Sequence, residues 1–171
     1  MEIFMNTLFL VHLLSGIFWG GVAYLLYFFI SPSVRALGPD GGKFMQVLTG
    51  KFKLPVWASN IALLNIFSGL VLFWFKYGGD LSIITTKSGF WLVIGMIAGM
   101  VAWLLAFFVF QRPAALQVAK LSMAIQKSEG PPAPELLAQM GVEQKKLGFG
   151  SMLTMVLLTI TIIGMSLGIH L

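Results

Sequence analysis

Four long runs of apolar residues, separated by polar segments, dominate the pattern along the chain. Each run is long enough to cross the hydrocarbon core of a bilayer as a helix, which takes roughly 20 residues. None alternates apolar and polar residues as the strands of a membrane barrel do, and helices are the other structures that satisfy their backbone groups in lipid. The pattern predicts an all-α fold, an integral membrane four-helix bundle that forms a single transmembrane domain over residues 1–171. The expected spans are residues 3–30, 55–75, 89–110 and 148–169.

The basic residues are concentrated in two of the three segments between the spans. Nine of the eleven lie in loops one and three, and neither terminus carries any. Because Lys and Arg are enriched in cytoplasmic loops, we expect loops one and three to be cytoplasmic and both termini to lie outside the inner (cytoplasmic) membrane. No cleavage pattern follows the first span, so we expect it to be retained rather than removed as a signal peptide. The nine residues are Arg35, Lys43, Lys51, Lys53, Arg112, Lys120, Lys127, Lys145 and Lys146.

Both cytoplasmic loops carry segments with helical periodicity. In loop one, turn residues at 38–42 precede residues 43–53, where apolar and basic side chains alternate at helical spacing. In loop three, residues 114–126 continue the periodicity of the third span, and a Gly-Pro-Pro break precedes a second short helix from about residue 134. We expect short amphipathic helices at the membrane surface, with anionic lipid as the partner of their basic side chains.

Composition and charge agree with a membrane protein. Of 171 residues, 58% are hydrophobic and 10% charged, with a mean hydropathy of +0.92, whereas soluble chains are about 25% charged. The net charge is +5, but membrane topology accounts for the basic residues, so we expect no nucleic-acid partner. The chain has no Cys, which excludes disulfides and thiolate sites.

A segment of the first span recurs in the third. Residues 22–29 match residues 101–108 at six of eight positions, with an offset of 79, and the same offset pairs Gly16 with Gly95 and Gly20 with Gly99. A two-fold parallel repeat of two-span units explains the match, and chance similarity between apolar segments is the alternative. The glycines suit close packing of spans one and three, or they leave room for a flat cofactor.

His12 is the ionisable residue that lies well inside a span. It shares a helical stripe with Ser15, Gly16 and Trp19 in the outer half of the first span. An ionisable residue within the membrane is a functional-site hypothesis by default. The alternative is a neutral imidazole that forms a hydrogen bond with a neighbouring Ser, Thr or Asn side chain, and the sequence leaves both open.

Candidate second ligands lie at a similar depth. Met96, Met165 and His170 fall in the outer halves of spans three and four, so with His12 they could hold haem b or copper, since His and Met are axial ligands of haem and thioethers suit Cu(I). Apolar packing of the methionines and a solvated His170 are the alternatives. Asn60 and Asn65, in span two, are expected to form interhelical hydrogen bonds.

Several motifs resemble those of the copper-resistance-D-like membrane family. They are Val11-His12-Leu13-Leu14, Trp19-Gly20-Gly21, the span exit Pro32-x-x-Arg35-x-Leu37, and Lys51-Phe52 through Ser68-Gly69-Leu70. A more distant similarity is to the protoporphyrinogen-oxidase membrane family. The resemblance implies haem or copper binding at His12, but span three lacks the Lys and His that related sequences often carry there.

Two functional hypotheses remain from different classes. The first is a copper-resistance-D-like protein that binds haem or copper through His12 and takes part in redox or metal handling. The second is a structural or accessory subunit of a larger membrane complex, or of a homo-oligomer, for which the 15 Phe and five Trp are suitable. No nucleophile and base, phosphate loop or carboxylate pair can be assembled, so catalytic residues are unknown and enzymatic activity is left open.

Overall fold

The computed structural model describes residues 1–37, 39–128 and 130–170, without the side chains of residues 39, 40, 81, 126, 169 and 170. Over this part of the chain the fold is all helical and contains no strand. In it, four helices are long and apolar enough to cross a membrane: Glu2–Ala36, Leu54–Tyr77, Lys87–Ile125 and Pro134–Gly168. The expected all-α membrane fold with four spans is therefore confirmed at this level.

The first and third spans each change from α-helical to π-helical hydrogen bonding near the cytoplasmic loops expected from the sequence. Proline follows shortly after each change and lacks the N–H that the α-helical ladder needs. The two π-helical segments begin 79 residues apart, which is the offset of the sequence match. The elements are α1 (Glu2–Leu25), η1 (Leu26–Ile30) and α2 (Ser31–Ala36) in the first half, and α5 (Lys87–Leu104), η4 (Leu105–Val109) and α6 (Gln111–Gln126) in the second.

Shorter elements connect these to the other two spans. Helix α4 begins after Lys53, which has a left-handed backbone with φ of 51°, and ends at Gly78, with φ of 62°. The predicted separate short helix from residue 134 is wrong, because that segment runs into the fourth span as one helix, with no proline between them. The elements are α3 (Pro39–Gln46), η2 (Val47–Lys51), α4 (Leu54–Tyr77), the 3₁₀ helix η3 (Leu81–Thr85) and α7 (Pro134–His170).

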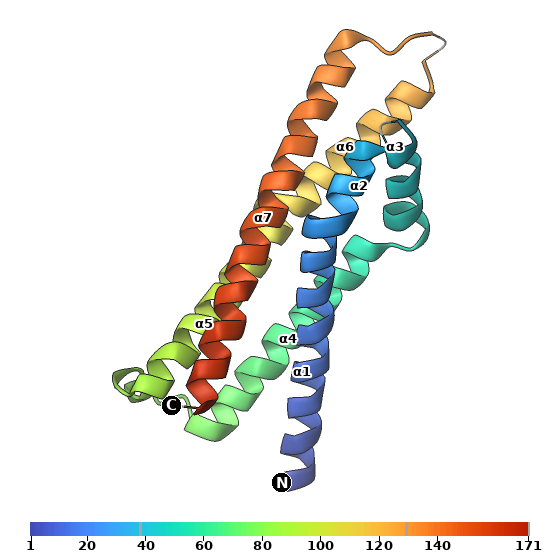
Figure 1. The fold of residues 1–171 in the computed structure, drawn as a ribbon. Coiled ribbons are helices and arrows are strands. Elements are labelled where there is room, and N and C mark those ends of the chain that lie inside the picture. The colour runs from blue at the N-terminus through green and yellow to red at the C-terminus, as the bar shows by residue number, and fades with distance from the viewer. Residues whose placement is uncertain (38, 129, 171) are drawn as a thin grey trace.

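The spans pack mainly as two pairs. Helix α1 lies along α4 and α5 lies along α7, while α6 packs on the N-terminal part of α7. Figure 1 shows that both termini lie at the same end of the bundle and that α1 and α7 diverge toward that end. Helices α1 and α7, one from each pair, therefore separate toward the termini (Figure 1).

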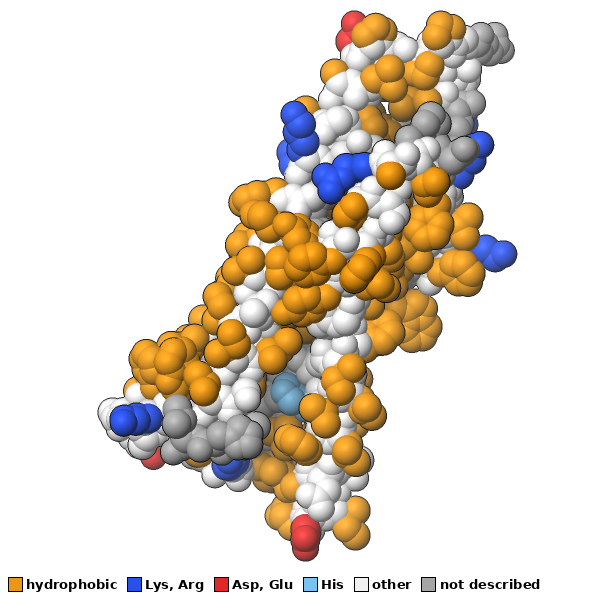
Figure 2. Space-filling model, viewed as in Figure 1, with side chains coloured by type: hydrophobic (Ala, Val, Ile, Leu, Met, Phe, Trp, Pro, Cys, Tyr) orange, Lys and Arg blue, Asp and Glu red, His pale blue; other side chains and the backbone are white. Residues whose placement is uncertain are grey.

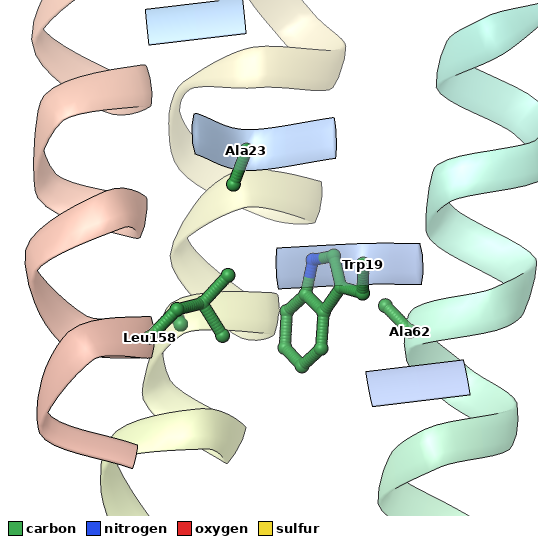
Figure 3. Close-up of a cluster of buried hydrophobic side chains, with 5 residues drawn as sticks. Trp19, Ala23, Ala62 and Leu158 are labelled. Carbon is green, nitrogen blue, oxygen red and sulfur yellow. The ribbon is translucent and has the colours of Figure 1, made fainter. Parts of the chain in front are cut away.

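A small hydrophobic cluster joins all four spans where the pairs approach. Trp19 of α1 is 7% exposed, and its indole lies between Ala62 of α4 and Leu158 of α7 (Figure 3). Ala23 and Ala102 complete the cluster. Alanines at these positions let the helix backbones come close, so one large side chain fills the space between four helices.

The glycines of spans one and three do not meet each other, so the predicted contact between those spans is wrong. A Cβ atom at Gly16 would lie 3.0 Å from Asn65 Nδ2 in α4, and one at Gly95 would lie 3.0 Å from the Thr161 carbonyl oxygen in α7. A Cβ atom at Gly20 would meet nothing within 4 Å. Gly16, Gly95 and Gly99 instead face the second helix of their own pair, whereas Gly20 faces no atom at this distance.

Candidate functional site

His12 lies in α1 on the side that faces the space between the two helix pairs. It is half-buried, and it is the histidine whose side chain the structure describes. In Figure 2 a pale-blue histidine surface is visible in a hollow, with apolar side chains on both sides. The imidazole is therefore neither on the outer lipid-facing surface nor enclosed within the hydrophobic cluster around Trp19.

One ring nitrogen of His12 is held by the backbone of α4. Nδ1 lies 2.8 Å from the carbonyl oxygen of Asn65 and 3.3 Å from Oγ of Ser68. Because a carbonyl oxygen only accepts hydrogen bonds, Nδ1 carries the proton and donates it to Asn65. Nε2 is then the nitrogen with the free lone pair, and it forms no hydrogen bond with any residue that the structure describes.

The Asn65 side chain binds α1 in return. Its Nδ2 atom donates to the carbonyl oxygen of His12 at 2.6 Å and to Oγ of Ser15 at 3.1 Å. Ser15 donates to the Val11 carbonyl and Ser68 donates to the Leu64 carbonyl. Asn65 is 9% exposed and Ser68 is 1% exposed, so these polar groups are paired with each other inside the protein rather than with water.

These contacts decide several of the sequence predictions. The expected interhelical hydrogen bonds are confirmed for Asn65. His12 forms a hydrogen bond with α4 as well, which is the contact that one of its two alternative interpretations requires. The expectation is wrong for Asn60, which is exposed and forms no hydrogen bond with the described residues. Sequence reasoning missed Ser68, although its position three residues after Asn65 places both on one helix face.

A small cavity lies beside the imidazole. Its volume is about 30 Å³, which is room for about two water molecules. Side chains from all four spans form its walls, and three of them are methionines. The lining residues are His12 and Trp19 of α1, Asn65, Ile66, Gly69 and Leu70 of α4, Gly95, Met96, Gly99 and Met100 of α5, and Thr161 and Met165 of α7.

The structure brings two of the three predicted second ligands to this cavity. Met96 and Met165 line it together with His12. The side chain of His170 lies outside the described residues, so its prediction is not tested. Met100 was not singled out in the sequence, although it follows Met96 by one helical turn and so lies on the same face.

The chemistry of the cavity fits a soft metal ion better than a macrocycle. Imidazole and thioether groups suit Cu(I), whereas a haem group does not fit a space of about 30 Å³ that holds about two waters. Among the residues that the structure describes, no group of three or more His, Asp or Glu side chains could hold a metal ion. The cavity is thus lined by one imidazole and three methionine side chains.

A different polar contact joins the two helix pairs to each other deeper in the bundle. The hydroxyl groups of Tyr24 in α1 and Thr159 in α7 lie 2.6 Å apart. Trp103 lies 79 residues after Tyr24, and its buried Nε1 has no hydrogen-bond partner among the described residues. The two halves of the chain thus differ in their polar contacts at this depth.

Comparisons with known protein families, with curated proteins and with solved structures found no match. The resemblance to the copper-resistance-D-like family therefore rests on the sequence motifs alone. Function has to be argued from the residues around His12 and from the arrangement of the four spans.

Proposed function

We propose that this integral membrane protein binds copper as Cu(I) through His12 and takes part in redox or metal handling within the membrane. The observation that carries the proposal is the orientation of one imidazole. The Asn65 carbonyl holds Nδ1–H at 2.8 Å, which leaves the Nε2 lone pair free beside a cavity with methionine walls. Metal-bound histidines typically donate their other N–H to a carbonyl or carboxylate in this manner.

The protein residues divide the task of binding the ion. His12 supplies the nitrogen ligand, and Met96 and Met165 supply thioether groups, which favour a soft, singly charged ion over harder cations. When bound, copper supplies one-electron chemistry. Haem is not part of the proposed site, because the cavity beside His12 has a volume of only about 30 Å³.

Copper titration of the purified protein tests the proposal. The protein in detergent is titrated with Cu(I) under reducing conditions against a coloured Cu(I) chelator, and its visible spectrum is recorded. We expect stoichiometric binding without a Soret band. His12→Gln should abolish binding, because glutamine has no ring nitrogen to bind the ion. The glutamine amide can still donate a hydrogen bond to the Asn65 carbonyl, so the helix contact is kept.

Matched variants separate ligand loss from general damage. Met96→Leu and Met165→Leu should weaken binding, because they remove thioether sulfur while keeping an apolar side chain. Met123→Leu is the control, since Met123 lies in α6, is 54% exposed and is not part of the cavity. A wild-type protein that takes up no Cu(I), or a His12→Gln variant that binds it equally well, would contradict the proposal.

The second candidate function is an accessory subunit of a larger membrane complex or a homo-oligomer. Its support is the low burial of α4. In the most apolar 18 residues of α4, 11% of the residues are buried, whereas the same share is 22% in the spans that contain α5 and α7. Phe67 and Trp74 of α4 are 65% and 64% exposed. Such a face suits lipid or a partner helix.

Photo-cross-linking distinguishes lipid from protein on that face. A photoreactive residue replaces Phe67, or Ile97 of α5, which is also exposed, and the mass of the products is measured in native membranes. The accessory hypothesis expects a discrete protein adduct at position 67 that is absent at position 97. An adduct of twice the chain mass identifies a homo-oligomer, and lipid adducts at both positions contradict the hypothesis.

The orientation that we propose places both termini outside and loops one and three in the cytoplasm. Its support is the position of nine of the eleven basic residues in those two loops. A reporter fused to the C-terminus, active only in an oxidising external compartment, should be active. Activity of a cytoplasm-specific reporter at that position would reverse the orientation.

Anionic lipid is the partner that we propose for the basic loops. Lys51 and Lys53 are exposed next to the exposed ring of Phe52, a combination typical of the membrane interface. Replacing both lysines with uncharged glutamine should reduce the amount of anionic lipid that the protein retains in native mass spectrometry. The same change at Lys76 and Lys87, which belong to the opposite loop, should not reduce it.

We also infer that the chain contains two related halves. The π-helical segments beginning at Leu26 and Leu105 keep the offset of 79 residues. Stacked ring pairs keep it too: Tyr24 with Phe28 and Trp103 with Phe107, at centroid distances of 6.2 and 5.3 Å. Agreement in helix geometry and ring stacking supports duplication over chance similarity of apolar segments.

A further inference from the structure

We infer that Gly69 is a positioning residue for His12: by leaving open the space beside its own backbone, it sets the plane of the imidazole and so selects Nε2 as the ligating nitrogen. This inference rests on the proposed copper site at His12. Gly69 takes no part in the hydrogen bonds among His12, Ser15, Asn65 and Ser68, because it has no side chain.

The imidazole occupies the place that a side chain at position 69 would need. A Cβ atom there would lie 2.7 Å from Cε1, 3.1 Å from Nδ1 and 3.6 Å from Nε2 of His12. The ring therefore lies against the bare backbone of α4, one helical turn after the Asn65 carbonyl that accepts its proton.

The backbone of α4 gives no other reason for glycine at this position. Gly69 is in the middle of a regular helix, and the glycines with positive φ are Gly78 and Gly79, among the residues that the structure describes. Glycine is a poor helix former compared with alanine. The space for the ring is thus what glycine provides.

Adding a methyl group should displace the ring rather than the helices. The ring is the end of a rotatable side chain, so it can turn away at less cost than α1 and α4 can separate. Turning moves Nδ1 away from the Asn65 carbonyl. Without that acceptor the proton is no longer restricted to Nδ1, so Nε2 is no longer always the nitrogen with the free lone pair. Loss of such a supporting contact typically lowers metal affinity by about 10- to 100-fold.

The test compares Gly69→Ala with Gly20→Ala. Gly20 is another helical glycine in this bundle, but a Cβ atom there would meet nothing within 4 Å, so Gly20→Ala controls for helix propensity. Nitrogen-15 NMR of histidine-labelled protein, without copper, reports which ring nitrogen carries the proton. We expect a protonated Nδ1 in wild type and in Gly20→Ala, and a mixture of tautomers in Gly69→Ala.

Copper titration of the same samples gives the second readout. We expect Gly69→Ala to bind Cu(I) about 10- to 100-fold more weakly, and Gly20→Ala to bind as wild type does. If wild type binds no Cu(I) while Gly69→Ala still shifts the tautomer, the proposed function fails and the positioning role stands. If wild type binds Cu(I) and Gly69→Ala changes neither readout, the positioning role is overturned.

A double variant covers the case in which Gly69→Ala is poorly folded. If the methyl group clashes with the ring alone, Gly69→Ala should be harmless to thermal stability in a His12→Ala background, because the ring is absent there. A stability loss of equal size in both backgrounds would show that the methyl group disturbs the helices themselves, and this result would also overturn the inference.

Discussion

The two helix pairs are held together by different means. Between α1 and α4, polar side chains bridge the helices, with Asn65 bound to the backbone of His12 and His12 bound to the backbone of Asn65. Between α5 and α7, the backbones themselves touch: a Cβ atom at Gly164 would lie 2.7 Å from the Trp91 carbonyl oxygen and 2.8 Å from the nitrogen of Gly95.

The difference separates a rigid contact from an adaptable one. Backbone atoms in a glycine contact cannot turn aside, so the α5–α7 pair fixes one wall of the cavity that contains Met96 and Met165. Side chains in the α1–α4 contact can adjust, and one of them, the imidazole of His12, has a nitrogen left over for a ligand. We therefore expect substitutions in the α5–α7 contact to lower stability most. Substitutions in the α1–α4 contact should lower stability less and ligand binding more.

The largest effect is expected for Gly164→Ala. The added methyl group meets backbone atoms of Trp91 and Gly95 at 2.7–2.9 Å, so the two helices must move apart, and overpacking of this kind costs about 1–3 kcal/mol. Thermal unfolding in detergent measures it. Gly20→Ala is the control and should be neutral or slightly stabilising, because its methyl group has free space and alanine favours helix. Equal stability of the two variants would disprove the close α5–α7 contact.

A smaller effect is expected for Asn65→Leu in the α1–α4 contact. The change removes the donor to the His12 carbonyl and to Ser15 Oγ, and interhelical hydrogen bonds in membranes contribute about 0.6–2 kcal/mol. Asn60→Leu is the matched control in the same helix, since Asn60 is exposed. A loss of stability in Asn60→Leu as large as that in Asn65→Leu would mean that the hydrogen bonds of Asn65 do not link α1 and α4.

The spans could be predicted from the sequence because the length of an apolar run is a local property. The predicted span 55–75 differs from α4 (Leu54–Tyr77) by one or two residues at each end. The continuous α7 was missed because the Pro-rich break before residue 134 suggested a separate surface helix, whereas the helix continues from the polar residues into the span.

Which helices pair could not be predicted, because that depends on faces that meet only in three dimensions. Gly16 and Gly95 were recognised, but their partners Asn65 and Gly164 lie in the other helix of each pair. Likewise His12 and Asn65 were each singled out, yet 53 residues separate them. A single sequence indicates that a buried polar residue needs a partner, but it does not say which one.

A still smaller effect is expected where the two helix pairs touch each other. Tyr24→Phe removes the hydroxyl group that lies 2.6 Å from Thr159 Oγ1, and the average bond of this kind contributes about 0.6 kcal/mol. Tyr27→Phe is the control, because Tyr27 makes ring contacts with Phe28 but no hydrogen bond with a described residue. Tyr24→Phe should unfold at a lower temperature than Tyr27→Phe. The opposite order would contradict a role for the hydroxyl contact.

The smallest effect is expected outside the membrane, at the connection between the two pairs. The exposed Asp80 carboxylate accepts hydrogen bonds from the backbone N–H and the hydroxyl of Ser82 at 2.8 Å each, and the backbone bond is the main cause that lowers the pKa of Asp80 below its ordinary value of 3.8. A carboxyl group with a lowered folded-state pKa stabilises the fold above its unfolded pKa, and this contribution is lost as pH falls through the folded pKa. Wild type should therefore unfold at a slightly higher temperature than Asp80→Asn at neutral pH, and the difference should shrink below about pH 3.8. A difference that stays constant across this range would mean that the charge of Asp80 does not stabilise the connection.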